Sequence, residues 1–166
     1  GATGFVGRAV VRELLARGKT PVCLVRSPAK LTAQHPQISP DRLVPVVGNL
    51  KDRSALRNAA GGCQAVIHLV GIILERRLQG QLFVGVHVRG TENVVEATIE
   101  AGGRRYVHMS ALGSRPDAVS AYHQTKWKAE EYVQRSGLDW TIFRPSLIHG
   151  PDGEFMRLMK QFMCAL

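Results

Sequence analysis

The chain has 166 residues, enough for one sizeable core, and its 45% hydrophobic and 21% charged residues exclude a disordered or fibrous protein. No apolar run approaches the ~20 residues that a membrane-spanning helix needs. The 22 basic and 13 acidic residues give a formal charge of +9. This charge suits a phosphorylated small molecule or an anionic membrane surface, whereas scattered basic residues without a recognisable nucleic-acid module argue against nucleic acid as a partner.

The chain begins with a glycine-rich turn that leads into an amphipathic helix ending near Gly18. A diphosphate must approach backbone amides closely, and a β-carbon would obstruct that approach. The helix that follows adds unpaired N–H groups and the positive end of its dipole. An ordinary turn is the alternative interpretation. We expect a dinucleotide to bind through its pyrophosphate at Gly1, Thr3, Gly4, Phe5, Val6 and Gly7.

Short β-branched runs alternate with longer helical patterns along the rest of the chain, which is the order of parallel β-α units. The runs are almost continuously apolar, as in strands covered on both faces. Residues 30–41 contain two prolines and are expected to form a surface loop. Strands are expected at residues 20–26, 43–47, 65–70, 105–110 and 140–144, and helices over residues 10–18, 84–102 and 120–135.

The glycine turn stands at the start of the chain, although such a turn should follow a strand. We expect residues 1–150 to form an α/β domain with a doubly wound parallel sheet that lacks its first strand. That strand would be central, so its absence would leave two strand edges unpaired and a groove through the core. Residues 151–166 begin an apolar helical pattern and are expected to start a C-terminal substrate lobe. The sequence is thus interpreted as a fragment of a longer protein.

Arg26 bears on the choice of dinucleotide. An acidic residue at the end of the strand after the first helix would accept a hydrogen bond from a ribose 2′-hydroxyl and favour NAD. This chain has Arg26 there, and a guanidinium can pair with a 2′-phosphate. A solvated surface arginine is the other interpretation. NADP(H) is therefore favoured, and NAD(H) is the alternative.

Tyr122 and Lys126 are four residues apart in the expected helix over residues 120–135, so they share one face. A phenol with a pKa of about 10 exchanges protons poorly at neutral pH, and a nearby ammonium favours its phenolate. Lys126 could also donate to a ribose hydroxyl. Ser110 falls at the carboxyl edge of the sheet, where open α/β sheets place ligands. The alternative for the Tyr–Lys pair is two surface side chains with apolar stems.

GATGFVG at residues 1–7, VRSP at residues 25–28 and the Tyr122–Lys126 pair resemble the extended and atypical branch of the short-chain dehydrogenase/reductase superfamily, whose members have NAD(P)-binding Rossmann domains. Residues 87–93, 106–113 and 140–146 are similar to the group that includes the NADPH-holding accessory subunit of respiratory complex I. Asn49 replaces a more common aspartate, and His87 stands where many extended members have asparagine.

The resemblance implies roles for further residues. Ser110 would orient a substrate carbonyl, Tyr122 would transfer a proton, and Lys126 would tune Tyr122. The cofactor would also lie along Asn49, Leu50, Val70, Gly71 and Pro145. The resulting expectation is an NADP-preferring oxidoreductase or epimerase that acts on a small carbonyl or hydroxyl substrate.

Two alternatives remain open for the function. The first is a non-catalytic subunit that holds NADPH within a larger assembly such as a respiratory complex, with a quinone-related partner. The second, nucleic-acid or regulatory binding through the basic surface, is the least favoured. The odd, scattered cysteines (Cys23, Cys63 and Cys164) indicate a reducing compartment, and the six histidines lack metal-ligand spacing, so no metal is expected. We expect a cytoplasmic protein or one peripheral on an energy-transducing membrane.

Overall fold

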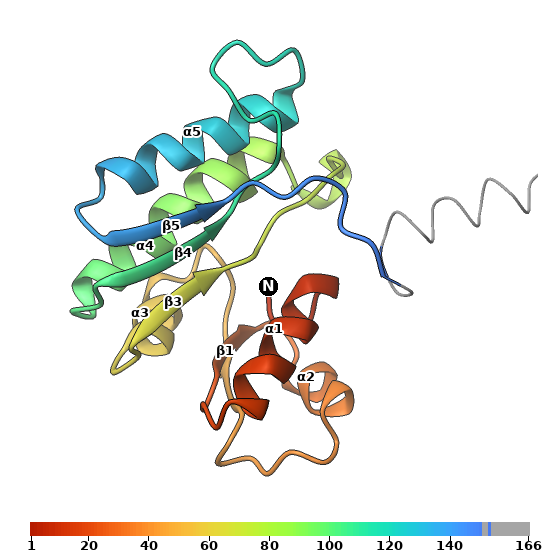
Figure 1. The fold of residues 1–166 in the computed structure, drawn as a ribbon, viewed down its shortest axis with the longest axis vertical. Helices are drawn as coiled ribbons and strands as arrows, with labels where there is room; N and C mark the ends of the chain where they lie inside the picture. The colour runs from red at the N-terminus through yellow and green to blue at the C-terminus, as the bar shows by residue number, and fades with distance from the viewer. Residues whose placement is uncertain (151–152, 154–166) are drawn as a thin grey trace, which may run out of the picture.

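The computed structural model describes residues 1–150 and residue 153. The expected start of a C-terminal lobe at residues 151–166 therefore lies almost entirely outside the described residues, as does Cys164. Within them, five parallel-paired strands alternate with helices (Figure 1). The elements are α1 (Phe5–Ala16), β1 (Val22–Val25), α2 (Pro28–Gln34), β2 (Val44–Val47), α3 (Arg53–Ala60), β3 (Ala65–His68), η1 (Arg77–Gln79), η2 (Val84–Arg89), α4 (Gly90–Glu100), β4 (Arg105–Met109), α5 (Ala121–Arg135) and β5 (Asp139–Phe143).

The expected strands and three expected helices are present, each strand within two residues of its expected bounds. Gly18, with φ of 71°, follows α1 in the left-handed conformation, which suits a residue without a β-carbon at a helix end. Ser120 caps α5 by accepting a hydrogen bond from the His123 N–H. These local signals were sufficient to place the five strands and the three expected helices.

The expectation of a loop over residues 30–41 is wrong in its first part, because Pro28–Gln34 forms α2. The Ser27 hydroxyl caps this helix by accepting from the Lys30 N–H at 3.4 Å, and Pro28 occupies the first helical position, where its missing N–H costs nothing. Leu31 anchors the helix in the core at 1% exposure. The prolines that suggested a loop lie beyond the helix.

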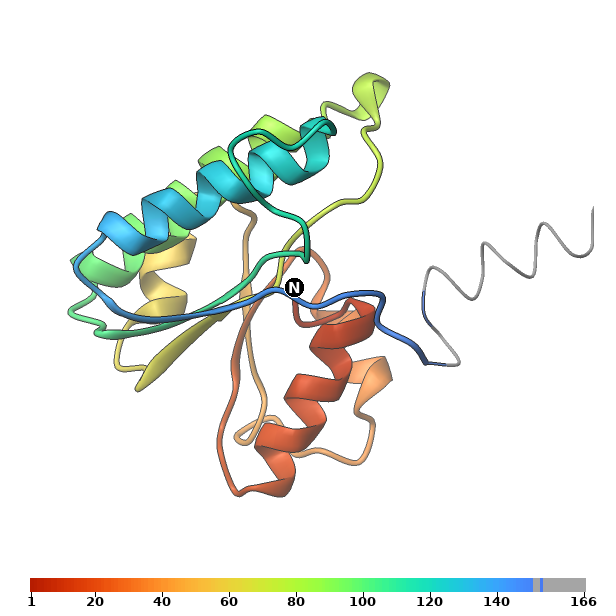
Figure 2. The same cartoon turned by 45° about the horizontal axis from the view of Figure 1, so that its top comes forward.

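The strands form two separate sheets. β1 pairs in parallel with β2, and β3, β4 and β5 form a second parallel sheet in that order. β1 and β3 each have one unpaired edge, and a groove of about 740 Å³ between them is lined by residues of both strands and of α1. Figure 2 shows the two halves diverging on either side of Gly1. The unpaired edges and the groove are confirmed, whereas the strand expected to fill the groove stays a prediction.

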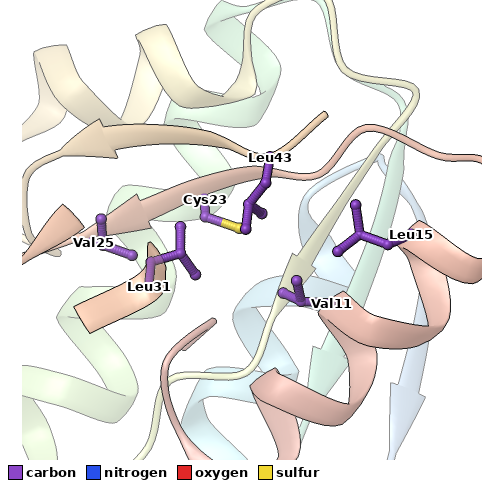
Figure 3. Close-up of a cluster of buried hydrophobic side chains, with 6 residues drawn as sticks. All are labelled: Val11, Leu15, Cys23, Val25, Leu31 and Leu43. Carbon is purple, nitrogen blue, oxygen red and sulfur yellow. The ribbon is translucent and has the colours of Figure 1, made fainter. Parts of the chain in front are cut away.

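Helices cover opposite faces of the sheets, and each layer has its own apolar core. On one face, α1 and α2 pack against β1 through a cluster that includes the buried Cys23 (Figure 3). On the other face, α3, α4 and α5 pack around Tyr106 of β4. Because the turn before α1 and the carboxyl ends of β1, β3, β4 and β5 all lie at one edge, the arrangement confirms a doubly wound α/β domain. None of the described helices is long and apolar enough to cross a bilayer.

Candidate functional site

The glycine turn presents backbone amides at the start of α1. The Gly4 N–H donates to the Gly1 carbonyl at 3.0 Å, and Gly4 is extended before the helix begins at Phe5. No side chain caps the first turn of α1, and no acidic residue lies in it. The first N–H groups of the helix thus donate to no capping side chain. Such N–H groups at helix N-termini bind anions.

Gly7 is the most constrained position of the turn. A β-carbon there would lie 2.0 Å from the Gly1 carbonyl oxygen and 2.8 Å from the Ala2 carbonyl carbon. The atoms that a Gly7 β-carbon would meet first belong to the turn itself, so the missing side chain leaves room for the turn. Gly1 is also closely packed, since a β-carbon there would lie 2.8 Å from the Leu69 β-carbon. The turn therefore rests on the chain that leaves β3.

Other expected cofactor residues surround the turn. The Thr3 carbonyl accepts from the Gln34 side chain at 3.2 Å, which ties the turn to α2. Phe5 packs against Gly150, where a β-carbon would lie 2.5 Å from its ring. Val6 is half-buried. Arg26 is exposed directly after β1, as expected for a side chain at the rim of the site.

Asn49 and Leu50 follow β2 and help to shape the same edge. The exposed Asn49 side chain accepts from the Lys51 N–H at 2.8 Å, which closes a local turn. The Leu50 carbonyl accepts from the Asn93 side chain at 2.8 Å, and the Leu50 side chain fills the space beside Gly90. These contacts join the loop after β2 to α4.

Lys126 is buried, with 4% exposure, so it is not a surface lysine. Its Nζ donates to the Met109 carbonyl oxygen at 2.6 Å, and a β-carbon on Gly71 would lie 3.5 Å from that Nζ. Burial lowers the pKa of Lys126 to about 8, and the nearby Glu130 carboxylate opposes this effect. The structure thus brings Gly71 and Lys126 together, with the ammonium still charged at pH 7. Val70, beside Gly71, is half-buried.

Tyr122 lies one turn before Lys126 and is half-buried between two rings. Its ring meets those of His87 at 5.4 Å and Phe83 at 5.8 Å edge-on. Burial raises the pKa of Tyr122, whereas we expected Lys126 to lower it. The ammonium of Lys126 is instead bonded to Met109 in this structure. The shared helix face is confirmed, and the proton-transfer role of Tyr122 stays a prediction.

Ser110 faces the protein interior at the end of β4. Its hydroxyl donates to the fully buried Glu130 and also lies 3.2 Å from the Ser114 hydroxyl. Arg144 binds both oxygens of the Glu130 carboxylate, with Nε at 3.0 Å from one of them. Pro145, next to Arg144, accepts from the Leu112 N–H at 2.8 Å. The ends of β4 and β5 are therefore joined through Glu130 of α5.

Glu130 is a site residue that sequence reasoning missed. The signal was present, because Tyr122, Lys126 and Glu130 recur at four-residue spacing and so share one helix face. A glutamate on the buried face of a helix needs a cationic partner, and Arg144 provides it. The pairing became evident only once β5 was placed beside α5.

His87 joins the loop after β3 to α5. It is 1% exposed, with Nδ1 at 3.0 Å from the Thr125 hydroxyl and Nε2 at 3.0 Å from the Ile72 carbonyl oxygen. Burial, together with the Lys126 ammonium, lowers the pKa of His87 to about 4, so the ring is neutral at pH 7. Both ring nitrogens of His87 are thus engaged in hydrogen bonds inside the protein.

We expect His87 to make the fold sensitive to acid. Its pKa is about 4 in the folded protein and about 6.5 when unfolded, so the unfolded chain binds the extra proton as pH falls below 6.5. Stability from the neutral ring is present above that pH and is lost as pH falls toward 4. Between pH 7 and pH 5, the free energy of unfolding measured with urea should fall by about 2 kcal/mol more for the wild type than for His87→Asn. Equal losses in both proteins would contradict this assignment.

His68 of β3 and His108 of β4 lie opposite each other in the paired strands. Both are buried, and His68 Nε2 lies 3.3 Å from the Thr91 hydroxyl. Neither ring nitrogen of His108 has a hydrogen-bond partner among the described residues. The His108 ring instead stacks on that of His68, with ring centroids 5.5 Å apart.

The assembled site fits a ligand with a diphosphate and a sugar. Uncapped helix amides and glycines that exclude side chains form one end. Buried Lys126 beside Gly71 forms the other, with the Tyr122 phenol one helical turn away. Such a site can hold a dianionic bridge with backbone donors, bind a hydroxyl with an ammonium and exchange a proton at a phenol.

Comparisons with known proteins agree with this chemistry. A protein-family model described as NAD(P)H-binding matches residues 1–161. Ceramide reductase of Caulobacter vibrioides is 35% identical over 96% of this chain and 49% of its own length. The mitochondrial NADH-ubiquinone oxidoreductase 40 kDa subunit of Neurospora crassa is 26% identical over 90% of this chain and 40% of its own.

The fold is also shared with solved structures. The Bordetella bronchiseptica enzyme WbmH, crystallised with NAD⁺, superposes with a TM-score of 0.79 at 22% identity, over 99% of this chain and 61% of that one. The chain thus spans about half the length of the curated relatives that it matches.

Proposed function

The chain belongs to the NAD(P)H-binding family, and from this premise we propose that the intact protein is an NADP-preferring oxidoreductase or epimerase of the short-chain dehydrogenase/reductase type. The observation that carries the proposal is the buried Lys126 beside Gly71, one turn from Tyr122 and at the same sheet edge as the uncapped glycine turn. If Tyr122 and Lys126 were only a pair of surface side chains, the Lys126 ammonium would be exposed to water. The substrate is a small molecule with a carbonyl or hydroxyl group.

The bound dinucleotide supplies the hydride chemistry. On the protein side, the glycine turn and α1 hold the pyrophosphate, and Lys126 donates to a ribose hydroxyl. Tyr122 gives its proton to the carbonyl oxygen of the substrate in reduction and takes it back in oxidation. Because burial disfavours the phenolate of Tyr122, this phenol is better prepared as a proton donor than as a base.

The names of the two curated relatives refer to lipid-soluble molecules, ceramide and ubiquinone. Lipid-soluble carbonyl compounds and quinones are accordingly the first substrates to test. A cytoplasmic location and a peripheral one on an energy-transducing membrane both remain compatible with this substrate class.

A titration of the intact protein with dinucleotides tests the proposal. We expect saturable binding of NADPH, followed by its oxidation when carbonyl compounds or quinones are added. Absence of any saturable heat or fluorescence change would refute cofactor binding.

Arg26 should decide the preference between the two dinucleotides. We expect Arg26→Gln to weaken NADPH binding about tenfold or more, because a charge-assisted hydrogen bond to the 2′-phosphate is lost. NADH binding should hardly change, since NADH lacks that phosphate. Arg12→Gln is the matched control, since Arg12 is exposed on α1 away from the turn. Equal NADPH affinity in both variants would leave Arg26 as a solvated surface arginine.

A second function is favoured by a specific contact. The Ser110 hydroxyl donates to buried Glu130, so it is engaged inside the protein. A non-catalytic subunit that holds NADPH within a respiratory assembly is consistent with that contact and with the similarity to the 40 kDa subunit. NADPH that exchanges slowly and is not oxidised by any carbonyl compound or quinone would support this function over the enzyme.

A further inference from the structure

A hairpin between β3 and η2 carries a concentrated group of exposed apolar side chains. Residues 73–84 form this hairpin, which contains η1, ends at the first residue of η2 and projects from the rest of the domain (Figure 2). Leu78 at its tip is fully exposed, and Leu74 is 70% exposed. Isolated exposed leucines are ordinary on protein surfaces, but several on one projecting segment indicate an interaction site. The apolar members exposed on the hairpin are Ile73, Leu74, Leu78, Leu82 and Val84.

The conformation of the hairpin is fixed by its own hydrogen bonds. Arg76 and Gln81 exchange two backbone hydrogen bonds, at 2.9 and 3.1 Å, and Gly80 turns the chain with φ of 65°. At the base, the Glu75 carboxylate accepts from the Phe83 N–H at 2.9 Å. These bonds hold the segment in a projecting conformation. Without them, the loop could fold back and pack its leucines against the rest of the protein. The exposure of Leu78 is therefore a property of an ordered structure.

Positive charge flanks the apolar tip. Arg76 and Arg77 immediately precede Leu78. The Arg77 side chain is 84% exposed and forms an ion pair with the Glu75 carboxylate at 3.6 Å. Arg76 forms no ion pair with any residue that the structure describes. The whole chain carries a formal charge of +9. An apolar tip next to two arginines is complementary to a surface with an apolar interior and an anionic face.

We propose that residues 73–84 dock the protein on an anionic phospholipid bilayer. Leu78 and Leu74 enter the boundary between headgroups and acyl chains, while Arg76 and Arg77 contact lipid phosphates. A protein partner fits less well, because a stable protein interface needs about 800 Å² from each side and this tip is a single narrow projection. The base of the hairpin stacks on the candidate site, since the Phe83 ring lies 5.4 Å from His87 and 5.8 Å from Tyr122. Docking therefore places the bilayer beside the site.

Sedimentation of the protein with phospholipid vesicles tests the proposal and is independent of cofactor binding. We expect co-sedimentation with phosphatidylcholine vesicles that contain phosphatidylglycerol, and little with phosphatidylcholine alone. Leu78→Asp should lower the partition coefficient about tenfold or more, because a buried leucine is lost. Each of Arg76→Gln and Arg77→Gln should lower it about fivefold at low salt. Val119→Asp is the matched control, since Val119 is 96% exposed elsewhere, and it should bind as the wild type does.

Three outcomes would overturn the proposal. The first is no binding to anionic vesicles. The second is binding that salt removes but Leu78→Asp leaves unchanged, which would indicate general attraction of a basic surface. The third is association between copies of the chain, detected by light scattering without vesicles and abolished by Leu78→Asp, which would make the hairpin a protein interface. Because Leu78 is fully exposed, its substitution should leave the unfolding midpoint unchanged, so misfolding would be recognised.

Discussion

Gly7→Ala is expected to reduce the affinity for NADPH a hundredfold or more. The added β-carbon would lie 2.0 Å from the Gly1 carbonyl oxygen and 2.8 Å from the Ala2 carbonyl carbon. Both contacts are with backbone, so relief requires the turn or α1 to move. Displacement of the turn misplaces the amides that face the pyrophosphate. Loss of two charge-assisted hydrogen bonds, at about 1.5 kcal/mol or more each, corresponds to at least this factor.

The measurement is isothermal titration of the purified intact variant with NADPH. Gly85→Ala is the matched control, because a β-carbon on Gly85 would meet no atom within 4 Å and the residue has an ordinary backbone conformation. Circular dichroism should show that Gly7→Ala remains folded, so that weak binding is not mistaken for unfolding. Unchanged NADPH affinity in a folded Gly7→Ala protein would remove the glycine turn from the binding site.

Tyr122→Phe is expected to lower the rate of hydride transfer about 10²–10⁴-fold while NADPH binding stays within twofold of the wild type. General acid catalysis contributes a factor of this size, and the substitution removes the proton with little loss of ring packing. The ring contacts with His87 and Phe83 persist in phenylalanine. A single-turnover measurement of NADPH oxidation, with the carbonyl compound that the wild type accepts, separates chemistry from binding.

Tyr132→Phe is the control for Tyr122→Phe, since it removes a phenol on the same helix. The Tyr132 hydroxyl donates to Glu96 at 3.0 Å, on the part of α5 that packs on α4. This variant should transfer hydride at the wild-type rate. If Tyr122→Phe does so as well, Tyr122 has no part in the proton transfer. If the wild type oxidises no NADPH with any substrate, the structural function is favoured.

Local sequence patterns predicted much of the fold correctly. The hydrophobic periodicities of strands and helices depend on neighbours within a few residues. The five strands, α1 and α5 could therefore be predicted from the sequence. The helix α2 was missed because Pro36 and Pro40 outweighed the Ser27-Pro28 start signal, although the helix ends before either later proline. The spacing of Tyr122 and Lys126 likewise predicted a shared helix face. That face is a local property.

Contacts between residues that are distant along the chain could not be predicted from the sequence. Ser110 was expected to face a substrate, yet its hydroxyl donates to Glu130, twenty residues away. Lys126 was equally compatible with an exposed position until burial against β4 was seen. The predicted direction of the Tyr122 pKa shift was wrong for the same reason. Desolvation depends on which distant segments cover a side chain.

The sequence by itself determined the glycine turn, the alternation of strands and helices, and the helix face that Tyr122 and Lys126 share. Each of these features depends on the spacing of residues that lie close along the chain. Tertiary structure alone decided that Gly7 leaves room for the backbone of the turn, that His87 bridges Ile72 and Thr125, and that residues 73–84 carry exposed apolar side chains. These features depend on which distant segments meet and which remain uncovered. The energies of burial and hydrogen bonding that follow from such contacts are set by the packed fold.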